Sequence, residues 1–378
     1  MRFSVKFTTA FVGAALIATT AVAQTQKPSV FSIAASDVGS YRYAEITAQG
    51  EAIDKQFGTK LRVMPLGNAV ARASALKTGR TDFWQSCSAY FNAFEGTGDF
   101  GAKSWGPQPL RLLLMSNRAA NFSPATAKES DIQTLADLKG KRVAWVVGNS
   151  GINIQTEAFL AAAGLTLDDV TLVEFPGYSP SVRGLITGDV DMALAANTSP
   201  VTLEVASSGA GISWIEIPAD DEKAWAAIEK IAPFVARTTI TRGAGVEEGQ
   251  SFELAGYPCP QYLAEDDLSE DKVYWFTKML VESYDGYKDA ITSAPYWQIE
   301  TAIKSHFAVP YHSGAVRYFK EIGVWSDEME AQNEKLKARG KVLGDAFAAV
   351  VKSFDGSDDD FPAYWEEQRS AALKAAGE

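Results

Sequence analysis

Short apolar runs and helical patterns alternate along the first part of the chain. Residues 30–35 and 61–64 are apolar runs of strand length, and each predicts a strand. The residues between them, up to about Lys55, predict a helix, and a second helix is expected to continue through Leu76. A further strand is predicted to begin at Thr81. Strands that alternate with helices form parallel βαβ units, so the pattern predicts an α/β fold.

Polar turns follow three of the predicted strands at the point where a helix begins. These turns contain Ser36, Gly67 and Ser150. The carboxyl ends of parallel strands gather at one edge of a sheet, and ligands of open α/β sheets bind at that edge. The turns are therefore the first places in which we expect ligand contacts.

The stretch of residues 138–165 combines a strand, a Gly/Ser turn and a helix. Residues 143–147 are apolar and rich in β-formers, residues 148–151 break the pattern, and Gly164 ends the helix that follows. This arrangement leaves free backbone N–H groups at a helix N-terminus, where an anion is stabilised. An ordinary βα turn is the alternative that this segment alone leaves open.

The remaining pattern divides the chain into two lobes joined by two crossings. The polar residues 117–130 are expected to be a loop that leads into the second lobe, and the glycine-rich residues 243–256 an irregular return. From Asp267 onward the chain is expected to be largely helical. The predicted units are a first lobe of residues 28–116 and 257–325, a second lobe of residues 117–256, and a helical extension with an acidic tail at residues 326–378.

Composition is that of a globular protein with two cores. The chain has 378 residues, of which 46% are apolar and 22% are charged. Its formal net charge of −12 and the lack of a dense Lys/Arg cluster argue against a nucleic-acid partner. An acidic protein can still contain one locally positive pocket, so an anionic small ligand stays compatible with the sequence.

The first 23 residues have the pattern of a secretory signal peptide. Arg2 and Lys6 precede an apolar run, and Ala21-Val22-Ala23 provides an A-x-A cleavage site. We expect cleavage after Ala23 and a mature protein in the periplasm. No later stretch approaches the ~18 continuous apolar residues that a membrane span needs.

Reactive and metal-binding groups are few in this sequence. Cys87 and Cys259 can form a disulfide in an oxidising compartment or remain two buried thiols, and the sequence leaves both readings open. His306 and His312 lack metal-ligand spacing, so we expect no metal and no cofactor. His312 is interpreted as a structural histidine. Neither Cys87 nor Ser150 has the neighbours of a catalytic nucleophile, so we expect no enzyme.

Several motifs resemble those of extracytoplasmic solute-binding proteins with two lobes, and more narrowly those of the TAXI receptors of TRAP transporters. They are residues 135–143, 150–151 and 188–193 for the wider group, and residues 39–41, 79–86, 271–278 and 311–321 for the TAXI receptors. The resemblance implies a periplasmic-binding-protein fold, in which each lobe is a mostly parallel sheet flanked by helices. It also implies a monomeric receptor that binds a small organic anion and delivers it to the membrane subunits of a TRAP transporter.

The turns expected to touch the ligand depart from the family's pattern. The first turn contains Asp37 where the family is glycine-rich, Asn68 directly follows Gly67 in the second, and Ile152 stands for a threonine in the third. The family's preference for glutamate or 2-oxoglutarate is therefore not assumed for this chain. An exported enzyme and a ligand sensor on the same fold are the alternatives that remain.

The expected ligand contacts come from both lobes. Tyr41 and Tyr178 are expected either to close over the ligand or to pack, and the Asn197 turn either to bind it or to cap the next helix. Arg183 and Arg242 are interpreted as solvated surface charges rather than counter-ions. The predicted ligand-binding residues are Ser36, Tyr41, Gly67, Asn68, Gln85, Ser86, Ser150, Gly151, Ile152, Asn197, Thr198 and Ser199.

Overall fold

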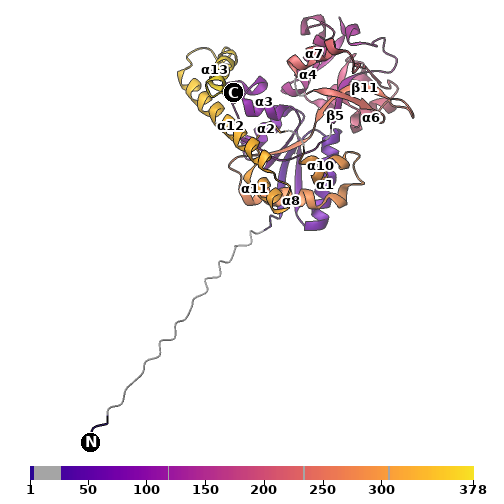
Figure 1. Ribbon diagram of the computed structural model, residues 1–378. Coiled ribbons are helices and arrows are strands. Elements are labelled where there is room, and N and C mark those ends of the chain that lie inside the picture. The colour runs from indigo at the N-terminus through magenta and orange to yellow at the C-terminus, as the bar shows by residue number, and fades with distance from the viewer. Residues whose placement is uncertain (4–26, 118, 233–234, 305–306) are drawn as a thin grey trace.

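The computed structural model describes residues 1–3, 27–117, 119–232, 235–304 and 307–378 (Figure 1). The predicted cleavage site after Ala23 lies outside these residues. The described chain forms two α/β lobes, with a pair of C-terminal helices beside one of them. The predicted two-lobed α/β fold is confirmed. Within the described ranges, no helix is long and apolar enough to cross a membrane.

Lobe one is built on a five-stranded sheet. Its strands are β1 (Val30–Ala35), β2 (Lys60–Pro65), β3 (Phe83–Ser86), β4 (Leu110–Met115) and β12 (Gln261–Glu265). The spatial order is β2-β1-β3-β12-β4, in which β1 runs parallel to β2 and β3 while β12 is antiparallel to both of its neighbours. The surrounding helices are α1 (Tyr41–Phe57), α2 (Ala69–Lys77), α3 (Ala89–Glu95), η1 (Gly98–Phe100), α8 (Glu270–Glu282), α9 (Tyr284–Tyr287), η4 (Ala294–Trp297), α10 (Ile299–Ala302) and α11 (Ser313–Glu321).

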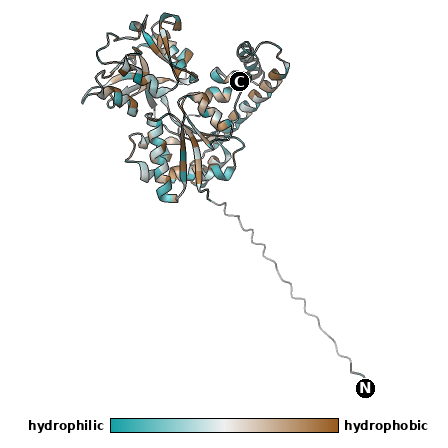
Figure 2. Ribbon diagram, turned by 180° about the vertical axis from the view of Figure 1, so that it is seen from behind, coloured by the Kyte–Doolittle hydropathy of each residue, from teal (hydrophilic) through white to brown (hydrophobic). Residues whose placement is uncertain are grey.

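Aromatic side chains hold the sheet of lobe one against its helices. Phe31 and Phe83 are fully buried, and Phe83 stacks on Phe276 of α8 with 4.2 Å between ring centroids. Figure 2 shows the strands of this lobe largely in brown, whereas the outer helices contain more teal. Burying such side chains stabilises the lobe by roughly 25 cal/mol per Å² of apolar surface. This packing fixes α1 and α2, whose N-termini lie at the carboxyl edge of the sheet.

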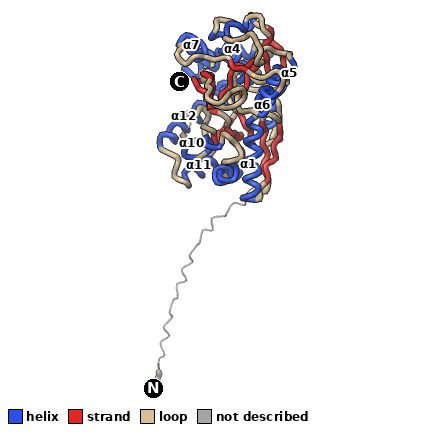
Figure 3. The backbone as a smooth tube through the Cα atoms, turned by 90° about the vertical axis from the view of Figure 1, so that its right-hand side faces the viewer, coloured by secondary structure: helices blue, strands red, loops and turns tan. Residues whose placement is uncertain are grey.

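Lobe two has a mixed sheet. Its strands are β5 (Ala119–Thr126), β6 (Arg142–Val146), β7 (Thr171–Phe175), β8 (Ala193–Ala196), β9 (Ser213–Trp214), β10 (Ala236–Ile240) and β11 (Phe252–Pro258). Four of them follow the order β10-β11-β5-β8, β9 pairs with β5, and a bridge between Val143 and Met192 connects the parallel pair β6-β7 to β8. The helices are η2 (Leu135–Leu138), α4 (Ser150–Ala162), η3 (Leu167–Asp169), α5 (Tyr178–Thr187), α6 (Pro200–Ser207) and α7 (Glu222–Ile231). Figure 3 shows α4 to α7 stacked above the helices of lobe one.

The expectations for the two crossings were each wrong in part. Most of residues 117–130 do not form a loop, because β5 pairs with β8 and β11 and buries Phe122 and Ala125, which lie on opposite faces of the strand. Residues 243–251 are irregular, as expected, but residues 252–256 belong to the strand β11, and the return to lobe one comes only after that strand. Polar residues and Pro124 concealed the first strand from pattern analysis. The chain therefore passes between the lobes at the short links from β4 to β5 and from β11 to β12.

The C-terminal extension forms a two-helix arm against lobe one. Its helices are α12 (Asp327–Ser353) and α13 (Phe361–Ala375), and the acidic residues near Asp358 form the turn between them. Glu95 at the end of α3 is buried and forms ion pairs with Arg339 of α12 and Arg369 of α13. Trp365 Nε1 donates a hydrogen bond to the carbonyl oxygen of Gly96 at 2.7 Å. The arm thus fixes the segment of lobe one that leads from α3 to η1.

Candidate functional site

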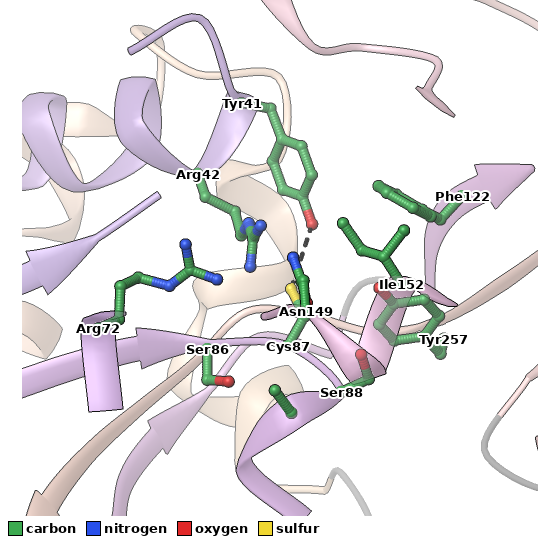
Figure 4. A pocket seen from close by; sticks show the side chains of 11 residues that line it. Tyr41, Arg42, Arg72, Ser86, Cys87, Ser88, Phe122, Asn149, Ile152 and Tyr257 are labelled. Atoms are coloured by element: carbon green, nitrogen blue, oxygen red, sulfur yellow. Dashed lines mark hydrogen bonds between the residues drawn. The ribbon is translucent and has the colours of Figure 1, made fainter. Parts of the chain in front are cut away.

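A small cavity lies between the lobes, at the carboxyl edge of the lobe-one sheet (Figure 4). Its volume is about 10 Å³, which is room for about one water molecule. The lobes are thus closed, and a solute can enter only when they separate. The lining residues are Tyr41, Arg42, Arg72, Ser86, Cys87, Ser88 and Ala89 from lobe one, and Phe122, Asn149, Ile152 and Tyr257 from lobe two.

Two buried arginines dominate the electrostatics of this cavity. Arg42 is the second residue of α1 and Arg72 the fourth of α2, and they are 6% and 2% exposed. Arg72 Nη1 donates to the carbonyl oxygen of Leu66 at 2.7 Å, and its Nε has no partner. No ion pair among the described residues contains either guanidinium. Burial and the charge of Arg42 lower the pKa of Arg72 to about 9, while Asp37 acts in the opposite direction.

Neutral polar groups accompany the arginines. The Ser86 hydroxyl is buried and has no hydrogen-bond partner. Asn149 is 4% exposed and does not cap α4 with its side chain. Buried polar atoms are normally paired, because leaving one unpaired costs about 1–3 kcal/mol. The unpaired Ser86 hydroxyl and Arg72 Nε on the lobe-one side of the cavity are therefore suited to a ligand that accepts hydrogen bonds.

A disulfide forms part of the cavity wall. Cys87, which follows β3, is bonded to Cys259, which lies between β11 and β12, and the two Cα atoms are 5.0 Å apart. The structure thus decides between the two readings that the sequence left open. The Tyr41 hydroxyl lies 2.9 Å from the Cys259 sulfur. Tyr41 and the disulfide together close the cavity on the side of the crossing.

The N-terminus of α4 already has an anionic partner. The Ser150 N–H donates to Asp99 Oδ2 of lobe one at 2.6 Å, and the Ser150 hydroxyl accepts from Asn92 Nδ2 at 3.3 Å. Gly151 packs so closely on lobe one that a Cβ atom there would lie 2.9 Å from the Ala89 nitrogen. In the closed structure a carboxylate of the protein occupies the place that the sequence assigned to a ligand carboxylate. Ile152, the residue after Gly151 in α4, does line the cavity.

A second lobe-one carboxylate caps α5 in the same way. Asp37 Oδ2 accepts a hydrogen bond from the Ser179 N–H at 2.8 Å. Lobe two in turn caps a helix of lobe one. The Ala69 N–H at the start of α2 donates a hydrogen bond across the cleft to the carbonyl oxygen of Gly148 at 3.0 Å. These helix ends hold the two lobes together around the cavity.

The other predicted residues lie beside the cavity rather than in it. Gly67 packs on Gly177, Asn68 caps α2 by accepting from the Ala71 N–H, and Gln85 donates to the Arg42 carbonyl oxygen at 3.0 Å. Ser36 is buried next to β1 without a partner for its hydroxyl. Of the twelve predicted residues, the cavity lining contains Tyr41, Ser86 and Ile152.

The turn after β8 serves mainly the packing of lobe two. Ser199 accepts a hydrogen bond from the Tyr178 hydroxyl at 3.1 Å and lies at the start of α6. Asn197 Nδ2 donates to the Arg242 carbonyl oxygen at 2.8 Å, and Asn197 and Thr198 line a separate polar cavity. In the closed structure, the contacts of this turn are therefore those of the structural role that the sequence left open.

Arg42 and Arg72 are not among the residues predicted from the sequence, in which Arg183 and Arg242 were the arginines considered. Arg183 forms a surface ion pair with Glu204 at 2.8 Å, as its interpretation as a solvated charge implied. A local signal was available, because a cation in the first turn of a helix opposes the helix dipole. Arg42 and Arg72 both occupy such unfavourable positions, directly after two of the turns predicted to face the ligand.

The described residues give no sign of a metal centre. No group of three or more His, Cys, Asp and Glu side chains in the described ranges is arranged to hold a metal ion. His312 Nδ1 accepts from the Gly314 N–H at 3.1 Å and caps α11, and burial lowers the pKa of His312. The interpretation of His312 as structural is confirmed.

Comparison with known proteins places these features in a family context. The NMT1-like family matches residues 33–323. Among solved structures, the alkanesulfonate-binding protein SsuA from Xanthomonas axonopodis pv. citri, bound to MOPS, is 14% identical, with a TM-score of 0.44 over 78% of this chain and 84% of that one. An ancestral arginine-binding protein bound to arginine is 15% identical, with a TM-score of 0.42 over 72% of this chain and 98% of that one.

Proposed function

The chain belongs to the NMT1-like family, and we propose that it is an extracytoplasmic receptor that binds a small organic anion between its lobes. The observation that supports this most directly is the pair of buried guanidiniums, Arg42 and Arg72, in a cavity between the lobes without a carboxylate partner. A buried charge without a counter-ion costs several kcal/mol, so a folded protein retains such a pair only where something offsets the cost. A ligand carboxylate is the group that offsets it here.

Binding would proceed by closure of the two lobes. In the open state the carboxylate meets Arg42 and Arg72 on lobe one, and closure then adds Asn149 and Ile152 from lobe two. Each charge-assisted hydrogen bond from a guanidinium contributes about 1.5–3 kcal/mol. Because the ligand contacts both lobes only when they are closed, it shifts the population toward the closed form.

The TAXI-like motifs support a more specific role. We propose that the closed, loaded form docks on the membrane subunits of a TRAP transporter and releases its ligand there. The predicted signal peptide supports a periplasmic location for this step, and membership of the NMT1-like family supports binding rather than catalysis. The proposed ligand contacts are Arg42, Arg72, Ser86, Asn149 and Ile152, with Tyr41 closing the cavity.

A ligand screen with matched variants tests the proposal. A thermal-shift screen of small carboxylic acids should identify compounds that raise Tm, and titration calorimetry should then give Kd for the wild type. Arg42→Gln and Arg72→Gln should each weaken binding by about 100-fold or more, which corresponds to losing about 2.7 kcal/mol. Arg183→Gln, on a surface arginine paired with Glu204, is the control and should change Kd less than twofold. Cavity variants that bind like the wild type would contradict the proposal.

A further inference from the structure

The cavity has a charged pole and an apolar pole. Arg42, Arg72 and the Ser86 hydroxyl lie on one side, and Phe122, Ile152 and Tyr257 lie on the other (Figure 4). Phe122, Ile152 and Tyr257 are at most 6% exposed. The ring centroids of Phe122 and Tyr257 are 6.3 Å apart, and the two rings form one side of an apolar wall. The Tyr257 hydroxyl is engaged in hydrogen bonds with Gln155 and Ser88. A ligand admitted between these two sets of residues when the lobes separate would therefore meet chemically different groups at its two ends.

The charged pole matches a single anionic group. Arg42 and Arg72 both line the cavity, and their guanidiniums lie on the same side of it (Figure 4), so one oxyanion placed there can meet both. None of the cavity-lining residues is acidic. The nearest carboxylate by its electrostatic effect, Asp37, caps α5 through the Ser179 N–H. An ammonium group would meet two guanidiniums without a counter-ion in this cavity.

The apolar pole disfavours a second charge at the other end of the ligand. A carboxylate placed against Phe122 and Ile152 would lose its hydration and gain no cation there. Resting on the proposed function, we infer that the ligand is a compact monocarboxylate with an uncharged, apolar body, and that α-amino acids and dicarboxylates are rejected. Specificity then arises from the missing partners for an ammonium or a second carboxylate.

Two matched pairs of acids test this inference by titration calorimetry on the mature protein. 4-Methylpentanoate differs from leucine by the α-ammonium, and pentanoate differs from glutarate by the second carboxylate. We expect each monocarboxylate to bind at least tenfold more tightly than its partner. Leucine or glutarate binding as tightly as its monocarboxylate match overturns the inference.

Variants at the apolar pole provide an independent readout. Phe122→Ala should weaken 4-methylpentanoate at least fivefold, whereas Phe91→Ala, which removes an exposed ring from α3, should leave Kd unchanged. If Phe122→Ala binds 4-methylpentanoate as tightly as the wild type, the inference that the apolar pole contacts the body of the ligand is overturned.

The outcomes separate this inference from the proposed function. If glutarate binds best and Arg72→Gln abolishes its binding, the receptor stands and the inference fails. If none of the four acids binds to the wild type and the wider acid screen is also negative, both fail.

Discussion

Two regions of the cleft offer positive electrostatic potential, and the protein uses them in opposite ways. At the rim, the N-termini of α4 and α5 are capped by Asp99 and Asp37 from the other lobe. At the centre, Arg42 and Arg72 are buried without a carboxylate. The capped helix ends stabilise the closed arrangement by themselves, whereas the arginines make it costly until an anion arrives. A helix N-terminus in a cleft is thus a weaker indication of a ligand site than an uncompensated buried charge.

The largest effect is expected when the central charge is removed. Arg72→Met should abolish binding of an anionic ligand and at the same time raise the free energy of unfolding by about 1–2 kcal/mol, because an apolar side chain of similar size removes a buried charge. Chemical denaturation and calorimetry on the same sample measure both quantities. A variant that is destabilised by several kcal/mol would show that Arg72 has a structural counter-ion.

Closure of the rim should be blocked by a side chain at the tightest contact between the lobes. Gly151→Asp places a Cβ atom 2.9 Å from the Ala89 nitrogen and adds a charge near Asp99. We expect at least 100-fold weaker binding and a larger radius of gyration in small-angle scattering, with an unchanged circular dichroism spectrum. Gly209→Asp is the matched control, because Gly209 does not have a positive φ and a Cβ atom there meets nothing within 4 Å. Ligand affinity and a radius of gyration equal to those of the wild type would show that the lobes close without this contact.

Removing one cap should have a moderate effect. Asp99→Asn loses the charge that faces the N-terminus of α4, which is worth about 1 kcal/mol, and should weaken binding about fivefold by favouring the open state. Asp168→Asn changes an exposed acid in η3 and should leave Kd unchanged. If Asp99→Asn lost more ligand affinity than Arg72→Met, the helix caps at the rim would matter more for binding than the arginines at the centre.

The smallest effect is expected from pH. The pKa of Arg72 is about 9 in the closed structure without a ligand, below its ordinary value, so its charge destabilises this form below pH 9 and this cost disappears as the pH rises. A bound anion raises that pKa again. Binding should therefore be constant from pH 7 to 8 and about twofold weaker at pH 9, with proton uptake that calorimetry in two buffers detects. Equal binding from pH 7 to 10, without proton uptake, would show that Arg72 keeps its charge in the free protein.

Sequence patterns predicted the periodic parts of the fold and the general position of the site. The strands β1, β2 and β7, the turns after β1 and β2, and the helical C-terminal part follow from local hydrophobic periodicity. β5 was missed because Asn121, Ser123 and Pro124 conceal its alternation, and its partners β8 and β11 are distant in sequence.

The site itself was harder to predict than the fold. Ser150 has the local sequence of an anion site, but its partner Asp99 comes from the other lobe, 51 residues away. Arg42 and Arg72 belong to different helices, and only tertiary packing brings them into one cavity. Local patterns indicate which edge of a sheet faces the cleft. They do not tell which charges on that edge remain unpaired.

The pairing of β5 with β11 makes lobe two an insertion with adjacent ends. Ala119, the first residue of β5, and Pro258, the last of β11, are directly opposite each other in the antiparallel ladder. A segment whose ends are neighbours can be exchanged as a cassette without stretching the host domain. Ile152, Phe122 and Tyr257 all belong to that cassette, whereas both arginines belong to the host. Swapping residues 119–258 between relatives would therefore change which apolar part of a ligand fits the cavity, while the host domain with its two arginines would still require an anionic group on the ligand.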